Sequence, residues 1–187
     1  PAAIAFVKKC LQDIVDEKYP LEKLIITKKL NSFYKNPGSI AHKVLAERMG
    51  KRDPGNKPSV GSRVPFVYIQ TKDNVKLQGD KIESPAYIRA NNIRPDYGFY
   101  ITNQIMKPVQ QVFALILEQI PAFRRKKAAF KRKCEYLKQE FKNDPTKYQK
   151  KEEQLRNKEV KTLLFADSLR QADNIKKGQK SIKKFFG

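Results

Sequence analysis

Apolar residues recur at the three- to four-residue spacing of an amphipathic helix in several stretches of the chain. The first stretch predicts a helix over residues 4–16, which Pro20 ends. A second predicts a helix over residues 40–50, with Ser39 as its N-cap behind the turn sequence NPGS. A shorter helix is predicted over residues 85–91.

The longest apolar stripe lies between residues 101 and 120. Its members are Ile101, Ile105, Val109, Val112, Phe113, Ile116, Leu117 and Ile120. Pro108 falls inside the stripe, and because a proline inside a helix costs about 3 kcal/mol, we expect a kink or a division there. Pro121 marks the expected end of the helix.

Two short segments have β character. Residues 24–27 form a β-branched run, and residues 63–69 form a second one in which Pro65 favours a strand start or a sheet edge. The sequence KRDPGNKPSVGSR, residues 51–63, is rich in Pro and Gly and predicts a loop. The fold class predicted is therefore mainly α with a small β element (α+β).

The composition becomes strongly basic after Pro121. Residues 121–187 carry 21 of the 40 Lys and Arg residues but 8 of the 19 Asp and Glu residues. Two helices are predicted here, over residues 124–142 and 146–172. From Asn174 onward the helical periodicity ends, and the lysine-rich remainder is typical of a flexible tail.

The formal charge of the whole chain is +21. Such an excess favours a polyanionic partner, with nucleic acid as the first candidate and an anionic membrane surface as the second. No apolar run approaches the roughly 20 residues that span a bilayer, and the N-terminal residues lack the features of a signal peptide. Because the chain starts with proline rather than methionine, we expect it to belong to a longer protein. A separate expectation is that this protein is intracellular.

Metal and thiol chemistry find little support in the sequence. Cys10 and Cys134 are 124 positions apart, which predicts two reduced thiols rather than a zinc site. His42 is the only histidine and has no Cys companion at metal-ligand spacing. We therefore expect no metal site and no cofactor in this chain.

The central segment AERMGKRDPGNKPSVGSRVPFVYI, residues 46–69, resembles the thumb region of family B DNA-directed DNA polymerases. That family carries a stretch close to RDPG-x-x-P-x-x-G-x-RVP-aromatic-V. The likeness extends upstream through LIITKKLNSFY and downstream through SPAYIRANNIRPDYGFYITNQIMKPVQQVF, so it covers roughly residues 1–120. The amino-acid sequence of residues 100–108 is most similar to that of polymerases of large DNA viruses.

The resemblance implies a nucleotidyltransferase whose palm aspartates hold Mg²⁺, but this chain contains no Asp-x-Asp pair. We therefore expect no catalytic residues here, and no activity from this chain alone. The implied organisation is an end of the palm and palm–thumb junction over residues 1–35 and a thumb over 36–120. A basic helical part of the thumb over 121–173 and a tail over 174–187 would follow, without the cysteine-rich modules of cellular replicative members.

A thumb grips primer–template duplex DNA through its phosphates, which requires cations on a fixed scaffold. The residues predicted to bind DNA on this ground are Lys28, Lys29, Lys51, Arg52, Lys57, Arg63, Lys107, Arg124, Arg125 and Lys126. Gly55 and Gly61 would permit tight turns in the loop. Asp53 is better explained by a turn cap or an arginine partner than by a metal. Tyr97, Phe99 and Tyr100 favour core packing over base stacking.

The last nine residues, QKSIKKFFG, resemble the peptide by which replication proteins hold a sliding clamp. Gln179 would hydrogen-bond at the pocket edge, while Ile182, Phe185 and Phe186 would gather on one side of a single 3₁₀ turn. The alternative is a tail that packs its aromatic residues back on the domain.

The predicted partners are therefore primer–template duplex DNA, a sliding clamp and the upstream palm of the same polymerase, at replicating DNA in a nucleus or viral replication compartment. One alternative is a free-standing, non-enzymatic accessory protein that binds nucleic acid. Another is a basic RNA-binding protein of ribosomal type.

Overall fold

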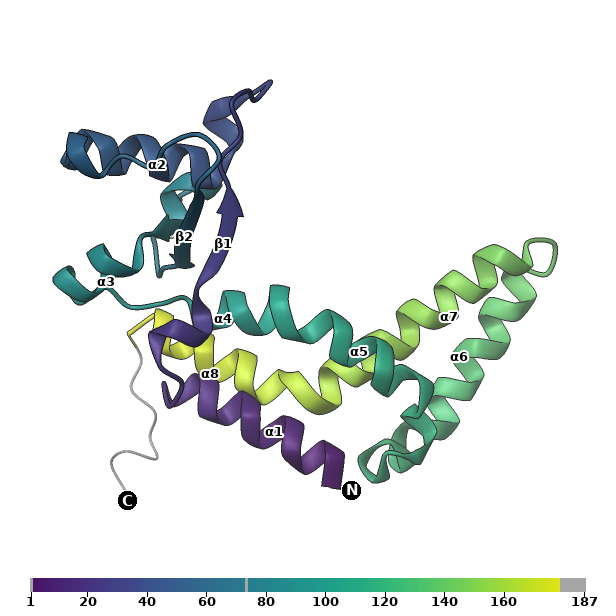
Figure 1. The fold of residues 1–187 in the computed structure, drawn as a ribbon. Helices are drawn as coiled ribbons and strands as arrows, with labels where there is room; N and C mark the ends of the chain where they lie inside the picture. Colours follow the sequence, from purple (N-terminus) through teal and green to yellow (C-terminus); the bar gives the residue numbers. More distant parts are fainter. Residues whose placement is uncertain (1, 73, 179–187) are drawn as a thin grey trace, which may run out of the picture. The chain divides into compact units, whose positions relative to one another are not determined.

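The fold is mainly α-helical with one small antiparallel sheet, as the sequence predicts (Figure 1). The computed structural model describes residues 2–72 and 74–178. The chain divides into two compact units. One consists of residues 19–100, and the other combines the N-terminal residues up to 18 with those from 101 onward.

The sheet of the first unit has the strand order β1-β2-β3. The strands are β1 (Ile26–Lys29), β2 (Arg63–Tyr68) and β3 (Ile82–Glu83). β2 is the central strand, yet β3 pairs only with Val67 and Tyr68. Pro65 therefore has a ladder partner on one side only, Thr27 of β1, which suits a residue without an N–H group.

Helix α2 (Ala41–Arg52) covers this sheet and completes the core of the unit. The buried cluster consists of Leu30, Leu45, Ala46, Val64, Phe66 and Ile82. The N-cap of α2 is Ile40, so the prediction of Ser39 as the cap is wrong. The Ser39 hydroxyl instead donates to the Asn36 carbonyl, because residues 37–39 form a 3₁₀ turn of their own.

Shorter helices complete this unit. They are η1 (Leu21–Leu24), η2 (Pro37–Ser39), η3 (Pro54–Asn56), η4 (Gln78–Lys81), α3 (Pro85–Asn91) and α4 (Tyr97–Tyr100). The predicted helix over residues 85–91 is confirmed, with the Ser84 hydroxyl accepting from the Tyr87 N–H as its cap.

The second unit is all helical in the part of the chain that the structure describes. Its helices are α1 (Ala2–Val15), η5 (Ile101–Ile105), α5 (Met106–Leu115), η6 (Leu117–Gln119), η7 (Pro121–Lys126), α6 (Lys127–Glu140), α7 (Pro145–Val160), η8 (Lys161–Phe165) and α8 (Ala166–Lys176). Its largest fully buried side chains are Leu11, Ile101, Leu117, Ile120, Phe123, Val160 and Phe165. None of the helices described is long and apolar enough to cross a membrane.

Pro108 lies inside the α-helix α5 and does not divide it, so the break in α-helical register is placed wrongly by the sequence and lies upstream of the proline. Residues 101–105 form a π-helical segment, and Pro108 is the third residue of the α-helix that follows. Where a π register changes to an α register, one carbonyl is left without an amide partner, so a proline is tolerated nearby. The helix also ends at Leu115 rather than near Pro121, and Val112 of the predicted stripe is 61% exposed.

Helices α6 and α7 form an antiparallel hairpin (Figure 1). The Asp144 carboxylate caps α7 by accepting from the Lys147 N–H at 2.9 Å. The predicted helix over residues 146–172 is divided by the π-helical segment η8, and α8 continues through Asn174 to Lys176. The helical structure therefore ends later than the loss of apolar periodicity indicates.

Candidate nucleic-acid interface

Two of the predicted DNA-binding cations face each other across the β1–β2 ladder. Lys29 is directly opposite Arg63 in the antiparallel register, so their side chains lie on the same face of the sheet. Both side chains are exposed, and the Arg63 guanidinium lies 3.4 Å from the Thr27 hydroxyl on that face. Like charges directly opposite each other destabilise a sheet, and a bound phosphate would remove that penalty.

A β-bulge at Gly61 lies next to this pair of cations. The Leu30 N–H donates to the Ser62 carbonyl, while the Leu30 carbonyl accepts from the Gly61 N–H. Gly61 and Ser62 thus oppose the single residue Leu30, which is the arrangement of a β-bulge. Gly61 has a φ of +89°, a conformation that other residues rarely adopt.

The loop that follows α2 is ordered by its aspartate. The Asp53 carboxylate accepts from the Gly55 N–H at 3.1 Å and caps the 3₁₀ turn η3, as one of the two sequence interpretations predicts. Lys51, at the end of α2, is exposed and makes no ion pair within the described ranges. Lys28, next to Lys29 on β1, is likewise exposed and unpaired there.

Arg52 is held by a buried carboxylate and an aromatic ring, and the sequence did not predict either contact. Its guanidinium donates to both carboxylate oxygens of Glu83, at 3.2 and 2.8 Å, and lies over the Tyr87 ring at 3.6 Å. Arg48 approaches the same carboxylate, with its Nε 3.0 Å from Oε1. The hydrogen bond to Glu83 raises the pKa of Arg52. Arg52 thus links α2 to the end of β3 and to α3.

Lys57 is also engaged within the chain. Its ammonium group lies 2.9 Å from a Glu47 oxygen, and Lys43 binds the other oxygen at 2.7 Å. Hydrogen bonds from Lys43 and Lys57 lower the pKa of Glu47 to about 2. Of the four loop cations predicted to bind DNA, Arg52 and Lys57 therefore hold intramolecular carboxylates, while Lys51 and Arg63 do not.

The predicted cations of the second unit divide in the same way. Lys107, Arg124 and Arg125 are exposed and form no ion pair in the part of the chain described. Lys126 is paired with Glu159 of α7 at 3.2 Å. Sequence reasoning missed this pairing because the two residues are 33 positions apart, and helical spacing signals only neighbours within one helix.

The aromatic residues near position 100 pack inside the first unit. Tyr97 and Tyr100 are buried, and the Phe99 ring stacks on Tyr68 with 3.5 Å between ring centroids. The Tyr100 hydroxyl donates to the Leu24 carbonyl at 2.7 Å and accepts from the Tyr68 N–H at 3.0 Å. Burial raises the pKa of Tyr100 to about 12. The preference for core packing over base stacking is confirmed for Tyr97 and Tyr100.

His42 packs beside Tyr34. Its Nε2 is 3.0 Å from the Tyr34 hydroxyl, and burial lowers the pKa of the imidazole. Within residues 2–72 and 74–178, no three His, Cys, Asp or Glu side chains gather closely enough to hold a metal ion. The predicted clamp-binding residues Gln179, Ile182, Phe185 and Phe186 lie outside the described residues.

Comparison with known proteins identifies the family. Residues 1–116 match the family model described as DNA polymerase family B, and this is more than half of the chain. The chain therefore belongs to DNA polymerase family B.

Three relatives, two of them viral, show how far the likeness extends along the chain. The DNA polymerase of Pyramimonas orientalis virus is 44% identical over 186 residues, which cover 98% of this chain and 15% of that protein. The DNA polymerase of Acanthamoeba polyphaga mimivirus is 48% identical over 122 residues, covering 62% of this chain and 7% of that protein. The DNA polymerase delta catalytic subunit of Glycine max is 39% identical over 119 residues, with coverage of 63% and 11%. The chain thus spans a small part of the length of each relative.

Proposed function

We propose that this chain is a C-terminal fragment of a family B DNA-directed DNA polymerase that includes the thumb and holds primer–template duplex DNA during replication. The family match over residues 1–116 supports this assignment. The observation that carries the binding role is the cross-strand pair of exposed cations, Lys29 and Arg63. Nucleotidyl transfer itself would take place on the palm of the polymerase, where aspartates would hold Mg²⁺.

The exposed cations suit a nucleic acid that is bound through its sugar–phosphate backbone, whatever its base sequence. Lysine and arginine neutralise phosphates without reading the base sequence. A polymerase must hold every sequence that it synthesises, so such contacts are the appropriate kind. The Lys29–Arg63 pair, together with Lys28 and Lys51, would supply these contacts on the first unit, and Lys107, Arg124 and Arg125 would supply them on the second.

The salt dependence of binding tests this proposal. The affinity of the chain for a primer–template duplex would be measured by fluorescence anisotropy at several salt concentrations. Each phosphate contact contributes about −0.9 to the slope of log K against log[salt]. We expect Lys29→Ala and Arg63→Ala each to reduce the magnitude of the slope by about 1.

Lys57→Ala provides the matched control, because Lys57 is a loop cation already paired with Glu47. Its slope should remain that of the unmodified chain. The proposal fails if the unmodified chain does not bind the duplex at low salt, or if the three variants change the slope equally. A structured RNA of the same length, bound more tightly than the duplex, would favour the RNA-binding alternative.

We further propose that the C-terminal residues bind a sliding clamp, on the ground of the sequence pattern alone. In QKSIKKFF, Ile182, Phe185 and Phe186 would fill an apolar pocket and Gln179 would fix the register. Short flexible linkers between two binding modules raise the effective concentration of the second partner to the millimolar range. A polymerase whose thumb releases the duplex between nucleotide additions would therefore stay near the DNA through its contact with the clamp.

A titration with the cognate clamp tests the tail. The double variant Phe185→Ala/Phe186→Ala should lose clamp affinity by at least tenfold, since hot-spot aromatic residues typically contribute 2 kcal/mol or more. Lys183→Ala is the control within the same segment and should bind nearly as well as the unmodified chain. Equal affinity of the double variant and the unmodified chain would exclude this role.

A further inference from the structure

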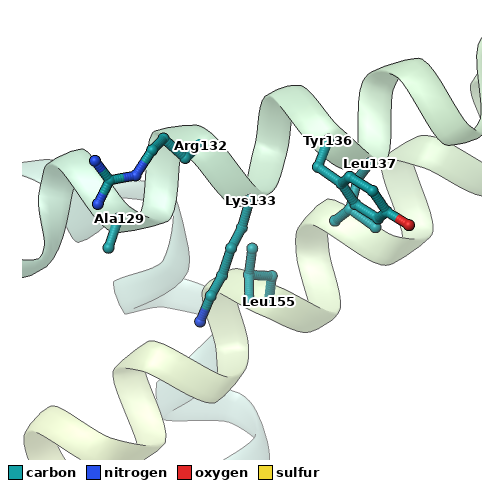
Figure 2. Close-up of a pocket in the computed structure, with 6 residues that line it drawn as sticks. All are labelled: Ala129, Arg132, Lys133, Tyr136, Leu137 and Leu155. Carbon is teal, nitrogen blue, oxygen red and sulfur yellow. The ribbon is translucent and has the colours of Figure 1, made fainter.

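A groove runs between helices α6 and α7, within the second unit (Figure 2). Its volume is about 500 Å³, which lies in the range of sites for small organic groups. The lining side chains are Ala129, Arg132, Lys133, Tyr136, Leu137 and Leu155. Five of them come from α6, and Leu155 contributes from α7.

The side chains that line the groove are partly apolar and partly cationic. Ala129, Leu137, Leu155 and the Tyr136 ring supply the apolar surface. Arg132 and Lys133 are the charged side chains of the lining, and neither forms an ion pair within the described part of the chain. The lining itself includes no carboxylate.

Among the side chains that line the groove, Tyr136 is unusual in its exposure to solvent. It is a large aromatic side chain on a two-helix hairpin, yet it is 66% exposed. The buried aromatic side chain of α6 is Phe130, on the adjacent helix face, where it packs edge-on against Phe123. Tyr136 therefore presents an accessible ring at one end of the groove, while the charged ends of Arg132 and Lys133 lie toward the Ala129 end (Figure 2).

We propose that this groove binds single-stranded DNA, with one unpaired base stacked on Tyr136 and neighbouring phosphates held by Arg132 and Lys133. The partner rests on the proposed function, since DNA is taken as the substrate of the chain. Non-specific single-strand sites combine cations that follow the backbone with aromatic rings on which bases stack. The unpaired template strand ahead of a primer end offers such bases.

The same features argue against other occupants. Duplex DNA keeps its base faces stacked, so it can use the cations but not the ring. The chain's own C-terminal segment carries Lys180, Lys183 and Lys184, and two unpaired cations would repel it. The charge complementarity of the groove therefore favours an anionic strand with exposed apolar faces.

The arrangement depends on helical spacing within α6. Ala129, Lys133 and Tyr136 follow one another at four and three residues, so they lie along one stripe of the helix. The small Ala129 leaves room at one end of this stripe, while Tyr136 stands at the other (Figure 2). A large side chain at position 129 would fill the groove without removing any charge.

The test compares two strands that differ only in their bases. A fluorescent oligothymidine and an abasic strand of equal length carry the same phosphates, but only the first can stack. We expect the unmodified chain to bind oligothymidine about tenfold more tightly than the abasic strand. Tyr136→Ala should remove this preference, Tyr136→Phe should retain it, and Ala129→Trp should remove it by occupying the groove.

The cations are tested separately. Arg132→Ala/Lys133→Ala should weaken binding of both strands and reduce the magnitude of the salt slope, whereas Tyr136→Ala should leave the slope unchanged. Lys138→Ala/Lys142→Ala, two exposed cations of the same hairpin outside the groove lining, should leave the preference for oligothymidine unchanged. Circular dichroism of each variant would establish that the helices are retained.

The outcomes separate this inference from the proposed function. Duplex affinity should be unaffected by Tyr136→Ala. If the chain binds duplex but Tyr136→Ala keeps the full preference for oligothymidine, the groove proposal is overturned while the thumb assignment stands. If an acidic amphipathic peptide displaces oligothymidine from the unmodified chain but not from Ala129→Trp, the groove is a peptide site and the proposal is likewise overturned.

Discussion

The Arg52 guanidinium and the Glu83 carboxylate form a two-pronged hydrogen-bonded ion pair between α2 and the end of β3. Glu83 is 4% exposed and also accepts from the Ser84 N–H at 3.0 Å. A carboxylate so deeply buried requires partners, because an unpaired charge in the interior is strongly destabilising. The arginine of the RDPG sequence therefore has a structural function in this fold.

The first prediction concerns this pair. Glu83→Ala should lower the free energy of unfolding by about 3 kcal/mol, because it leaves Arg48 and Arg52 beside each other without their carboxylate. Arg52→Ala should be similarly destabilising, since it removes two hydrogen bonds from the buried Glu83 carboxylate. Urea denaturation followed by circular dichroism measures both effects.

Arg52→Lys distinguishes the structural function from a phosphate contact. Lysine keeps the charge but loses the two-pronged geometry and the stacking on Tyr87. We expect it to destabilise the chain while leaving the salt slope of duplex binding intact. Normal stability together with a reduced slope would instead make Arg52 a DNA contact.

The second prediction concerns Gly61. A Cβ at this position meets no atom within 4 Å, so a substitution there is opposed by the backbone conformation rather than by a clash. With φ at +89°, Gly61→Ala should cost about 1–2 kcal/mol of stability. Gly38→Ala is the matched control, since Gly38 is equally open and does not have a positive φ. Equal thermal midpoints for the two variants would contradict this account of the bulge.

The sequence predicted the helices well where apolar periodicity was strong. The helix over residues 4–16 corresponds to α1, whereas Pro108 lies within the continuous helix α5 and does not divide it. The π-helical segments η5 and η8 were not predictable, because a change of hydrogen-bond register leaves no simple compositional mark. The cap of α2 was misassigned because Ser39 belongs to a separate 3₁₀ turn.

The candidate site was predictable as a set of cations but not as an arrangement. Sequence placed Arg52, Lys57 and Arg63 in one basic loop, and nothing local distinguished them. The structure shows that Arg52 and Lys57 bind carboxylates, whereas Arg63 faces Lys29 across the ladder. Ion pairing over long sequence distances depends on the tertiary fold, so composition cannot reveal which cations remain available to a ligand.

The third prediction concerns Glu47 at acidic pH. Its pKa is lowered to about 2 by Lys43 and Lys57, so its contribution to stability is complete above about pH 4.5 and is lost as the pH falls toward 2. The stability difference between the unmodified chain and Glu47→Gln should therefore shrink over this interval. Because the Glu47 side chain is 41% exposed, solvent screening keeps the difference small, and added salt should reduce it further. A difference that grows as the pH falls would contradict the assignment.

The fourth prediction concerns Tyr100, whose hydroxyl joins the Leu24 carbonyl to the Tyr68 N–H. Tyr100→Phe removes both hydrogen bonds and leaves these two backbone groups without that partner, so it should lower the free energy of unfolding by about 1–3 kcal/mol. The pKa of Tyr100 is raised to about 12, mainly by burial, so the folded state keeps its phenolic proton at pH values where the unfolded chain loses it. This contribution to stability is complete below about pH 10 and is lost as the pH rises from 10 to 12. Urea denaturation between pH 8 and 12 should therefore show a steeper loss of stability for the unmodified chain than for Tyr100→Phe, and parallel curves would exclude Tyr100 as the titrating group.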